Sequence, residues 1–158
     1  MNTSAFPDSQ SHIGTTINDY SMIKKIDEKT NRLVPIDIPD TNNWNSESVK
    51  FIQKEISITD GLTKCIVLTH HAPLFSNKSE NLLTCNEQYI DSTNKYAFHN
   101  DLVSLFVKPI RVWIYGHTHY ASKAKYNDII LATNQLGYAH EENNIKFNSY
   151  AWIDLSLI

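Results

Sequence analysis

The sequence predicts an α/β fold of the α+β kind, organised around a mixed β-sheet. A helix-like pattern at residues 46–56 leads directly into an apolar strand at 64–68, which is the order typical of α/β proteins. A second apolar, β-prone strand follows at 111–115. Two short β-prone segments, 122–126 and 129–133, then flank Asn127-Asp128, a two-residue turn of the hairpin type. Parallel strands followed by an antiparallel hairpin together predict a mixed sheet.

The first 45 residues are expected to be mostly loop or extended chain. Residues 1–20 are polar and contain few large apolar side chains. A short turn or strand is expected at 22–27. Pro35 and Pro39 argue against a helix or a central strand in residues 31–39, because proline lacks an N–H donor and fixes its own backbone angle. This segment is therefore predicted to be extended and peripheral.

The helix at 46–56 is predicted to begin after Ser46, which can cap its first turn. Val49, Ile52 and Ile56 recur at helical spacing and form its apolar face. Residues 74–95 show little periodicity and are predicted to be a long functional or disordered loop. Apolar residues in 96–106 predict a second amphipathic helix that ends before Pro109.

The later part of the chain is predicted to add strands to the same domain. Beyond the hairpin, residues 144–148 and 150–155 form a further candidate strand pair. The length of 158 residues corresponds to one domain, so residues 1–158 are interpreted as a single unit.

The overall composition argues against several classes of partner. A net charge of −3 provides no basic field for nucleic acid or for an anionic membrane. The amino terminus lacks a signal-peptide pattern, and no apolar run is long enough to span a bilayer. Cys65 and Cys85 are interpreted as free thiols of a reducing compartment. We therefore expect a soluble cytoplasmic protein that binds neither nucleic acid nor membrane.

Two histidine clusters follow the two apolar strands in the same way. His70 and His71 come after residues 65–69, and His117 and His119 come after Gly116 at the end of the strand 111–115. Ligands of open α/β sheets bind at the carboxyl ends of strands, and neutral imidazole is a common metal ligand. The paired clusters therefore predict a metal site. His12, His99 and His140 stand alone and are expected to be exposed or to make ordinary hydrogen bonds, with His99 on the polar side of its helix.

These motifs, in this order, resemble the C-terminal half of a calcineurin-like metallophosphoesterase. The resemblance rests on a His-x-Pro motif at 71–73, a Gly-His-x-His motif at 116–119 and Asn-Gln-Leu-Gly-Tyr at 134–138, with weaker similarity upstream. It implies a sandwich of two mixed β-sheets flanked by helices, with a dinuclear site at the strand ends. It also implies that a metal-bridging hydroxide hydrolyses a phosphomonoester or phosphodiester.

The resemblance assigns metal ligands residue by residue. His71 and His117 correspond to ligands of one metal ion and His119 to a ligand of the other, while His70 is a neighbour that could support them. A complete member holds two divalent ions such as Mn, Fe or Zn. No substrate-binding residue can be assigned. Leu136 stands where many relatives have arginine, so a phosphate contact there is not expected.

The early motifs of the family are missing from the sequence. It contains no Asp-x-His, Gly-Asp or Gly-Asn-His, so the carboxylate ligands and the catalytic histidine have no counterparts. We interpret the chain as an N-terminally truncated member that binds one ion weakly and is inactive alone. Truncation also predicts exposed sheet edges and self-association.

Two other interpretations remain open. The chain could be a non-catalytic metal-binding or interaction remnant of the fold, which would explain the missing carboxylates. Alternatively, the histidines could be purely structural. The first would bind metal without hydrolysing a phosphate ester, and the second would leave metal content unchanged when His117 and His119 are replaced.

Overall fold

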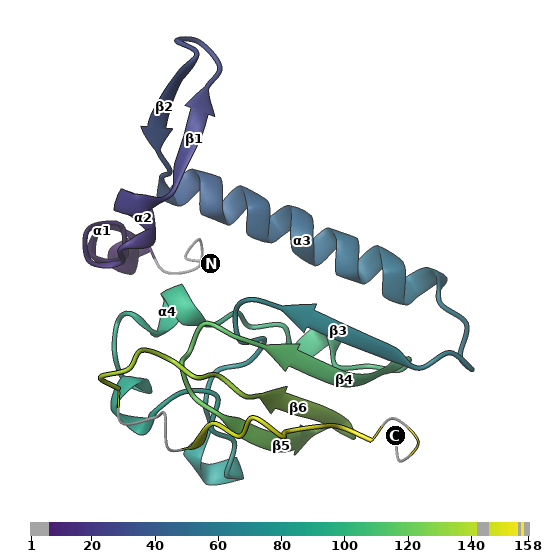
Figure 1. Cartoon of the computed structure of the whole chain (residues 1–158). Helices are drawn as coiled ribbons and strands as arrows, with labels where there is room; N and C mark the ends of the chain where they lie inside the picture. The colour runs from purple at the N-terminus through teal and green to yellow at the C-terminus, as the bar shows by residue number, and fades with distance from the viewer. Residues whose placement is uncertain (1–6, 142–145, 155, 157–158) are drawn as a thin grey trace.

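The computed structural model describes residues 7–141, 146–154 and 156. Within them the chain is a mixed α/β structure with two sheets and four α-helices (Figure 1). The helices are α1 (Pro7–Thr16), α2 (Asp19–Met22), α3 (Ile38–Ile58) and α4 (Lys95–Phe98). The strands are β1 (Lys24–Asp27), β2 (Arg32–Pro35), β3 (Cys65–Thr69), β4 (Ile110–Tyr115), β5 (Ser122–Tyr126) and β6 (Ile129–Thr133).

The main sheet has the strand order β3-β4-β6-β5 and is mixed, as the sequence predicted. β3 pairs in parallel with β4, and β4 pairs in parallel with β6. β5 and β6 form the predicted antiparallel hairpin. Its turn residues Asn127 and Asp128 have φ of 46° and 65°, the left-handed geometry that a two-residue hairpin turn requires.

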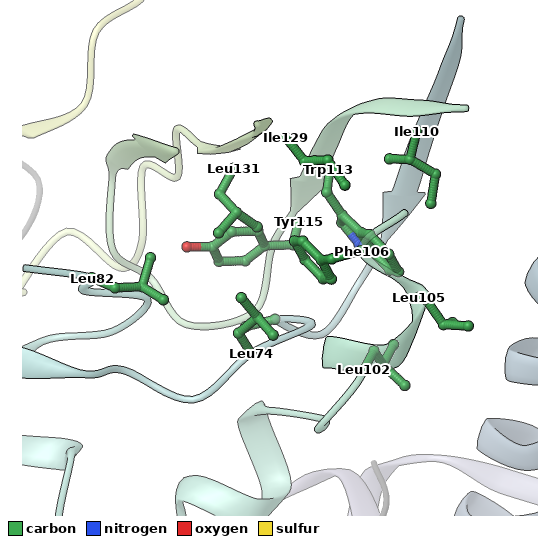
Figure 2. Close-up of a cluster of buried hydrophobic side chains, with 11 residues drawn as sticks. Leu74, Leu82, Leu102, Leu105, Phe106, Ile110, Trp113, Tyr115, Ile129 and Leu131 are labelled. Carbon is green, nitrogen blue, oxygen red and sulfur yellow. The ribbon is translucent and has the colours of Figure 1, made fainter. Parts of the chain in front are cut away.

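The core lies between the sheet and the segments that cross its face (Figure 2). Trp113 of β4 is fully buried and stacks on Phe106, with ring centroids 5.0 Å apart. Helix α3 lies over the β3 side of the sheet and packs its predicted apolar face against this core (Figure 1). That face consists of Val49, Ile52 and Ile56.

The segment 74–95 is ordered around buried side chains, although it is a long connection. It contains two short 3₁₀ helices, Lys78–Glu80 and Glu87–Tyr89. Leu74 and Leu82 join the core, and Thr84 is fully buried. The segment is therefore a packed part of the structure. Cys85, within it, and Cys65 are both free thiols, as predicted.

The expectation that residues 1–45 are mostly loop or extended is wrong for the described residues that form helices, whereas the short strand expected at 22–27 is present as β1. Helices α1 and α2 precede the β1–β2 hairpin, and α3 begins at Ile38. Asp37 caps α3, because its side chain accepts from Asp40 N–H at 3.0 Å while Asp40 returns a bond to Asp37 N–H. Pro39 lies in the first helical turn, where its missing N–H costs nothing. Ser46 therefore lies inside the helix and does not cap it.

The prediction of a helix at 96–106 is also wrong. Helix α4 ends at Phe98, and His99 is extended with φ of −127° and ψ of 155°. The backbone of this segment pairs with Ala72, whose N–H donates to Phe98 O at 3.1 Å and whose carbonyl accepts from Asn100 N–H at 2.8 Å. Tertiary backbone pairing thus overrides the local periodicity, and only a 3₁₀ helix, Val103–Leu105, follows.

The strand pair expected at 144–148 and 150–155 is not formed by its described members. Residues 144, 145 and 155 lie outside the described part of the chain. Residues 146–154 contain no strand; this segment is tied to the end of β6 by two hydrogen bonds between Asn134 and the backbone of Asn148. No helix among the described residues is long and apolar enough to cross a membrane.

Candidate metal centre

The parallel pairing of β3 and β4 brings the two histidine clusters together. Thr69 and Tyr115 are in register, so both strands end at the same edge of the sheet. The next residues continue this approach, because Gly116 N–H donates to His70 O at 2.9 Å. The two histidine clusters that predict a metal site therefore lie together at one edge of the sheet.

Three imidazoles converge at this edge. One potential ligand nitrogen from each of His70, His71 and His117 lies within 4.8 Å of the others. His70 Nε2 and His117 Nδ1 are 3.0 Å apart, and the ring centroids of the three residues are separated by 4.5 to 5.0 Å. We call His70, His71 and His117 the histidine triad.

The turn after β4 is shaped to hold His117 in this position. A Cβ at Gly116 would lie 3.4 Å from His70 O, at the short limit of an ordinary van der Waals contact. His117 has φ of 66°, and Thr118 N–H closes the turn onto Gly116 O at 2.8 Å. A non-glycine residue in this left-handed region costs about 1–3 kcal/mol, and such strain clusters at functional sites. The strained backbone places the imidazole of His117 beside that of His70.

The triad is electrostatically suited to a cation. His71 Nε2 and His117 Nε2 are buried and have no hydrogen-bond partner among the described residues. Burial, reinforced by the neighbouring imidazoles, lowers the pKa of His71 to about 2 and that of His117 to about 3. Both rings are therefore neutral near pH 7, which is the form that binds metal. An unpaired buried polar atom costs about 1–3 kcal/mol, and a bound metal would remove that cost.

His119, predicted to bind a second ion, lies outside the triad and is held separately. Its Nδ1 lies 3.0 and 2.9 Å from the two carboxylate oxygens of Glu141. Its backbone N–H donates to Gln135 Oε1 at 2.8 Å, and its ring forms a T-shaped pair with the ring of Tyr138, with centroids 4.7 Å apart. Tyr138 N–H also donates to Glu141 at 2.7 Å. His119 therefore has one ring nitrogen engaged by a carboxylate, which leaves Nε2 as its available ligand atom.

Sequence reasoning missed two parts of this arrangement. The motifs predict His70 only as a neighbour of the ligands, yet it is the exposed member of the triad. No motif predicts a role for Glu141, although it follows closely on the Gly-Tyr at 137–138. Strand pairing brings His70 into the triad, and the turn at 138–141 brings Glu141 to His119. Neither contact follows from the local sequence.

The isolated histidines behave partly as expected. His12 and His140 are exposed. His99 is buried, contrary to the predicted polar helix face, because the helix ends before it. Its hydrogen bonds are ordinary ones: Nδ1 lies 2.9 Å from Lys95 O, and Nε2 lies 3.0 Å from Thr84 Oγ1.

A cleft opens beside the triad, between α3 and the end of β3. Its volume is about 730 Å³, and its lining includes His70, His71 and Asn100 together with apolar side chains of α3. Trp44 and Phe51 are the largest of these apolar side chains. The cleft combines an apolar wall with imidazoles at one end, an arrangement common in small-molecule sites.

Comparison with known proteins finds a viral relative. The chain is 53% identical over 144 residues to "Uncharacterized protein L509" of Acanthamoeba polyphaga mimivirus. The match covers 91% of this chain but 49% of the mimivirus protein, so the chain spans about half the length of that relative. No protein-family profile and no solved structure matches the chain.

Proposed function

We propose that this chain is part of a metal-dependent phosphoesterase of the calcineurin-like class, a hydrolase acting on a phosphomonoester or phosphodiester. The observation that carries the proposal is the convergence of His71 and His117 from two parallel strand ends, each with a buried, unpartnered Nε2. His71 and His117 would hold one divalent ion, and His119 would hold a second. Divalent ions in such a site supply a nucleophilic water and neutralise phosphate oxygens.

The donor set of the described residues fits only part of such a site. The candidate metal group found there consists of imidazoles and contains no carboxylate. Hard ions that act on phosphate esters are normally bound by carboxylates as well. The proposal therefore requires carboxylate ligands from sequence that this chain does not contain, within a complete two-sheet sandwich. The extra length of the mimivirus relative is consistent with such a second half.

The motif content of the mimivirus protein provides the first test. We expect the part of that protein outside the matched region to contain Asp-x-His, Gly-Asp and Gly-Asn-His motifs ahead of it. If that part precedes the match and lacks these motifs, or if it lies entirely after the match, the proposed carboxylate half does not exist.

Activity provides the second test. The purified mimivirus protein should hydrolyse p-nitrophenyl phosphate or bis(p-nitrophenyl) phosphate when Mn²⁺, Fe²⁺ or Zn²⁺ is added, and a chelator should abolish turnover. The present chain is the matched comparison and should be inactive alone, because its sequence lacks the carboxylate motifs of the family. Absence of turnover by the longer protein with every metal and both esters would overturn the proposal.

A second candidate function is a non-catalytic metal-binding or interaction module. The lack of a carboxylate beside the triad within the described residues favours it. It predicts that both proteins bind metal and that neither hydrolyses a phosphate ester. If His117→Ala leaves the metal content unchanged, neither function holds and the histidines are structural.

A further inference from the structure

We propose that His70 is a direct metal ligand, so that the histidine triad forms a single-ion site that this chain assembles by itself. The inference rests on the metal-binding part of the proposed function, but it does not require the second half of a phosphoesterase. Neither the motif assignment nor the relative identifies His70 as a ligand. A transition-metal ion such as Zn²⁺ is the expected occupant, because imidazole suits it.

The spacing of the ring nitrogens supports direct ligation. Two imidazole nitrogens that share one zinc ion, each at ~2.0–2.1 Å from it, lie about 3.3 Å apart in tetrahedral geometry. His70 Nε2 and His117 Nδ1 are already 3.0 Å apart. One nitrogen of each of the three rings, that of His71 included, lies within 4.8 Å of a nitrogen of each of the other two, so rotation of side chains can close the remaining gap.

The backbone that carries His70 and His71 is held in place by the fold. The Thr69 hydroxyl donates to His71 O at 2.8 Å and accepts from the indole N–H of Trp113 at 3.0 Å. Gly116 N–H holds His70 O from the neighbouring strand end. Because these hydrogen bonds hold the two strand ends together, the three imidazoles lie close before a metal binds, and binding requires little further ordering of the chain.

The triad also has an open side. His70 is exposed, and it lines the 730 Å³ cleft together with His71, whereas His71 and His117 are partly buried. Three protein ligands with one accessible position are typical of zinc sites that bind water or a small anion as the fourth ligand. The triad therefore has the form of an accessible site rather than a closed structural one.

The competing role for His70 is to position His117. In that case a hydrogen bond between the two rings would fix the tautomer of His117, and only His71 and His117 would contact the ion. His70→Gln separates the two roles, because the glutamine amide can still hydrogen-bond to the ring but is a poor zinc ligand. His70→Ala removes both roles.

The experiment uses the full chain with Zn²⁺ alone. Zinc affinity is measured by competition with a chromophoric chelator, and the number of imidazole ligands is measured by zinc X-ray absorption. His12→Ala, which replaces an exposed histidine of helix α1, is the matched control. Circular dichroism confirms that each variant is folded.

We expect three imidazoles in the unmodified chain and two in His70→Gln, with zinc affinity reduced by more than the roughly 100-fold that loss of an outer hydrogen-bond partner can cost. His12→Ala should match the unmodified chain. Two imidazoles in the unmodified chain, an unchanged count in His70→Gln, or no zinc binding would each overturn the inference. If zinc in this chain has three imidazole ligands but the longer mimivirus protein hydrolyses no phosphate ester, the proposed phosphoesterase function is overturned and the triad site stands.

Discussion

At the residue scale, the contact between Glu141 and His119 has a direct chemical consequence. A carboxylate at 2.9 and 3.0 Å from Nδ1 favours the tautomer with the proton on that atom, which leaves Nε2 with its lone pair. Partial burial raises the pKa of Glu141, but the hydrogen bonds from Tyr138 N–H and His119 outweigh it and hold the pKa below its usual value. The carboxylate is therefore ionised near pH 7.

We predict that Glu141→Gln weakens this tautomer preference. Long-range ¹⁵N–¹H NMR of the neutral ring should show Nδ1–H as the main form of His119 in the unmodified chain and a mixture of tautomers in the variant. Exposed Glu80 provides the control, and Glu80→Gln should leave the His119 signals unchanged. Identical tautomer populations in the unmodified chain and in Glu141→Gln would show that Glu141 does not position the ring.

The two partly buried imidazoles of the triad, those of His71 and His117, make folding stability depend on pH in the metal-free protein. The pKa values of His71 and His117 are about 2 and about 3 in the folded chain, against about 6.5 when unfolded. Between these limits the unfolded chain binds more protons, so stability rises with pH up to about 6.5 and falls as the solution is acidified. Each histidine contributes up to about 1.4 kcal/mol per pH unit in that window.

Urea denaturation in chelator at about pH 7 and about pH 4.5 measures this dependence. His71→Gln and His117→Gln should each flatten it, because glutamine does not titrate. His12→Gln, which replaces an exposed histidine, should not. Equal slopes in all of these proteins would mean that His71 and His117 are protonated as easily in the folded chain as in the unfolded one.

At the scale of secondary structure elements, the position at which α3 begins decides which of two residues caps the helix. The sequence favoured Ser46, whereas the structure places the capping box at Asp37 and Asp40. Asp37→Ala should destabilise the protein by about 1 kcal/mol, because it leaves a helix N–H without its acceptor. Ser46→Ala, inside the helix and exposed, should change the free energy of unfolding by less than about 0.5 kcal/mol. Urea denaturation of both variants measures the difference, and an equal effect would contradict the assigned cap.

The elements that could be predicted are those whose signal is local and strong. β3, β4 and the β5–β6 hairpin follow from apolar runs and from the turn at Asn127-Asp128. The helix expected at 96–106 failed because Ala72, distant in sequence, pairs with the backbone on both sides of His99. For the site, the two strand-end clusters were predictable, because both strands carry histidines at their carboxyl ends. That His70 belongs to the triad and His119 lies outside it depends on the strand register and on the geometry of the turn after β4. Neither can be predicted from a single sequence.

At the scale of the whole molecule, β3 is an open edge of the main sheet. In the part of the chain that the structure describes, β3 pairs only with β4. Leu68 of β3 is 71% exposed, and Ile66 is 38% exposed. An edge strand with unpaired backbone groups and exposed apolar side chains is a template for pairing with another chain. This edge is where the predicted self-association would occur.

We therefore predict that the chain associates in a concentration-dependent way and that Leu68→Lys reduces the association. A charge on an edge strand opposes pairing with a second strand, because the charged group would have to be desolvated or brought near its copy. Leu62→Lys is the matched control, since Leu62 is 93% exposed but lies in the turn between α3 and β3. Sedimentation velocity over a range of concentrations should show a shift toward monomer for Leu68→Lys only. An equal shift for both variants would indicate non-specific hydrophobic contact, and a monomer at every concentration in the unmodified chain would show that the β3 edge is protected without a partner.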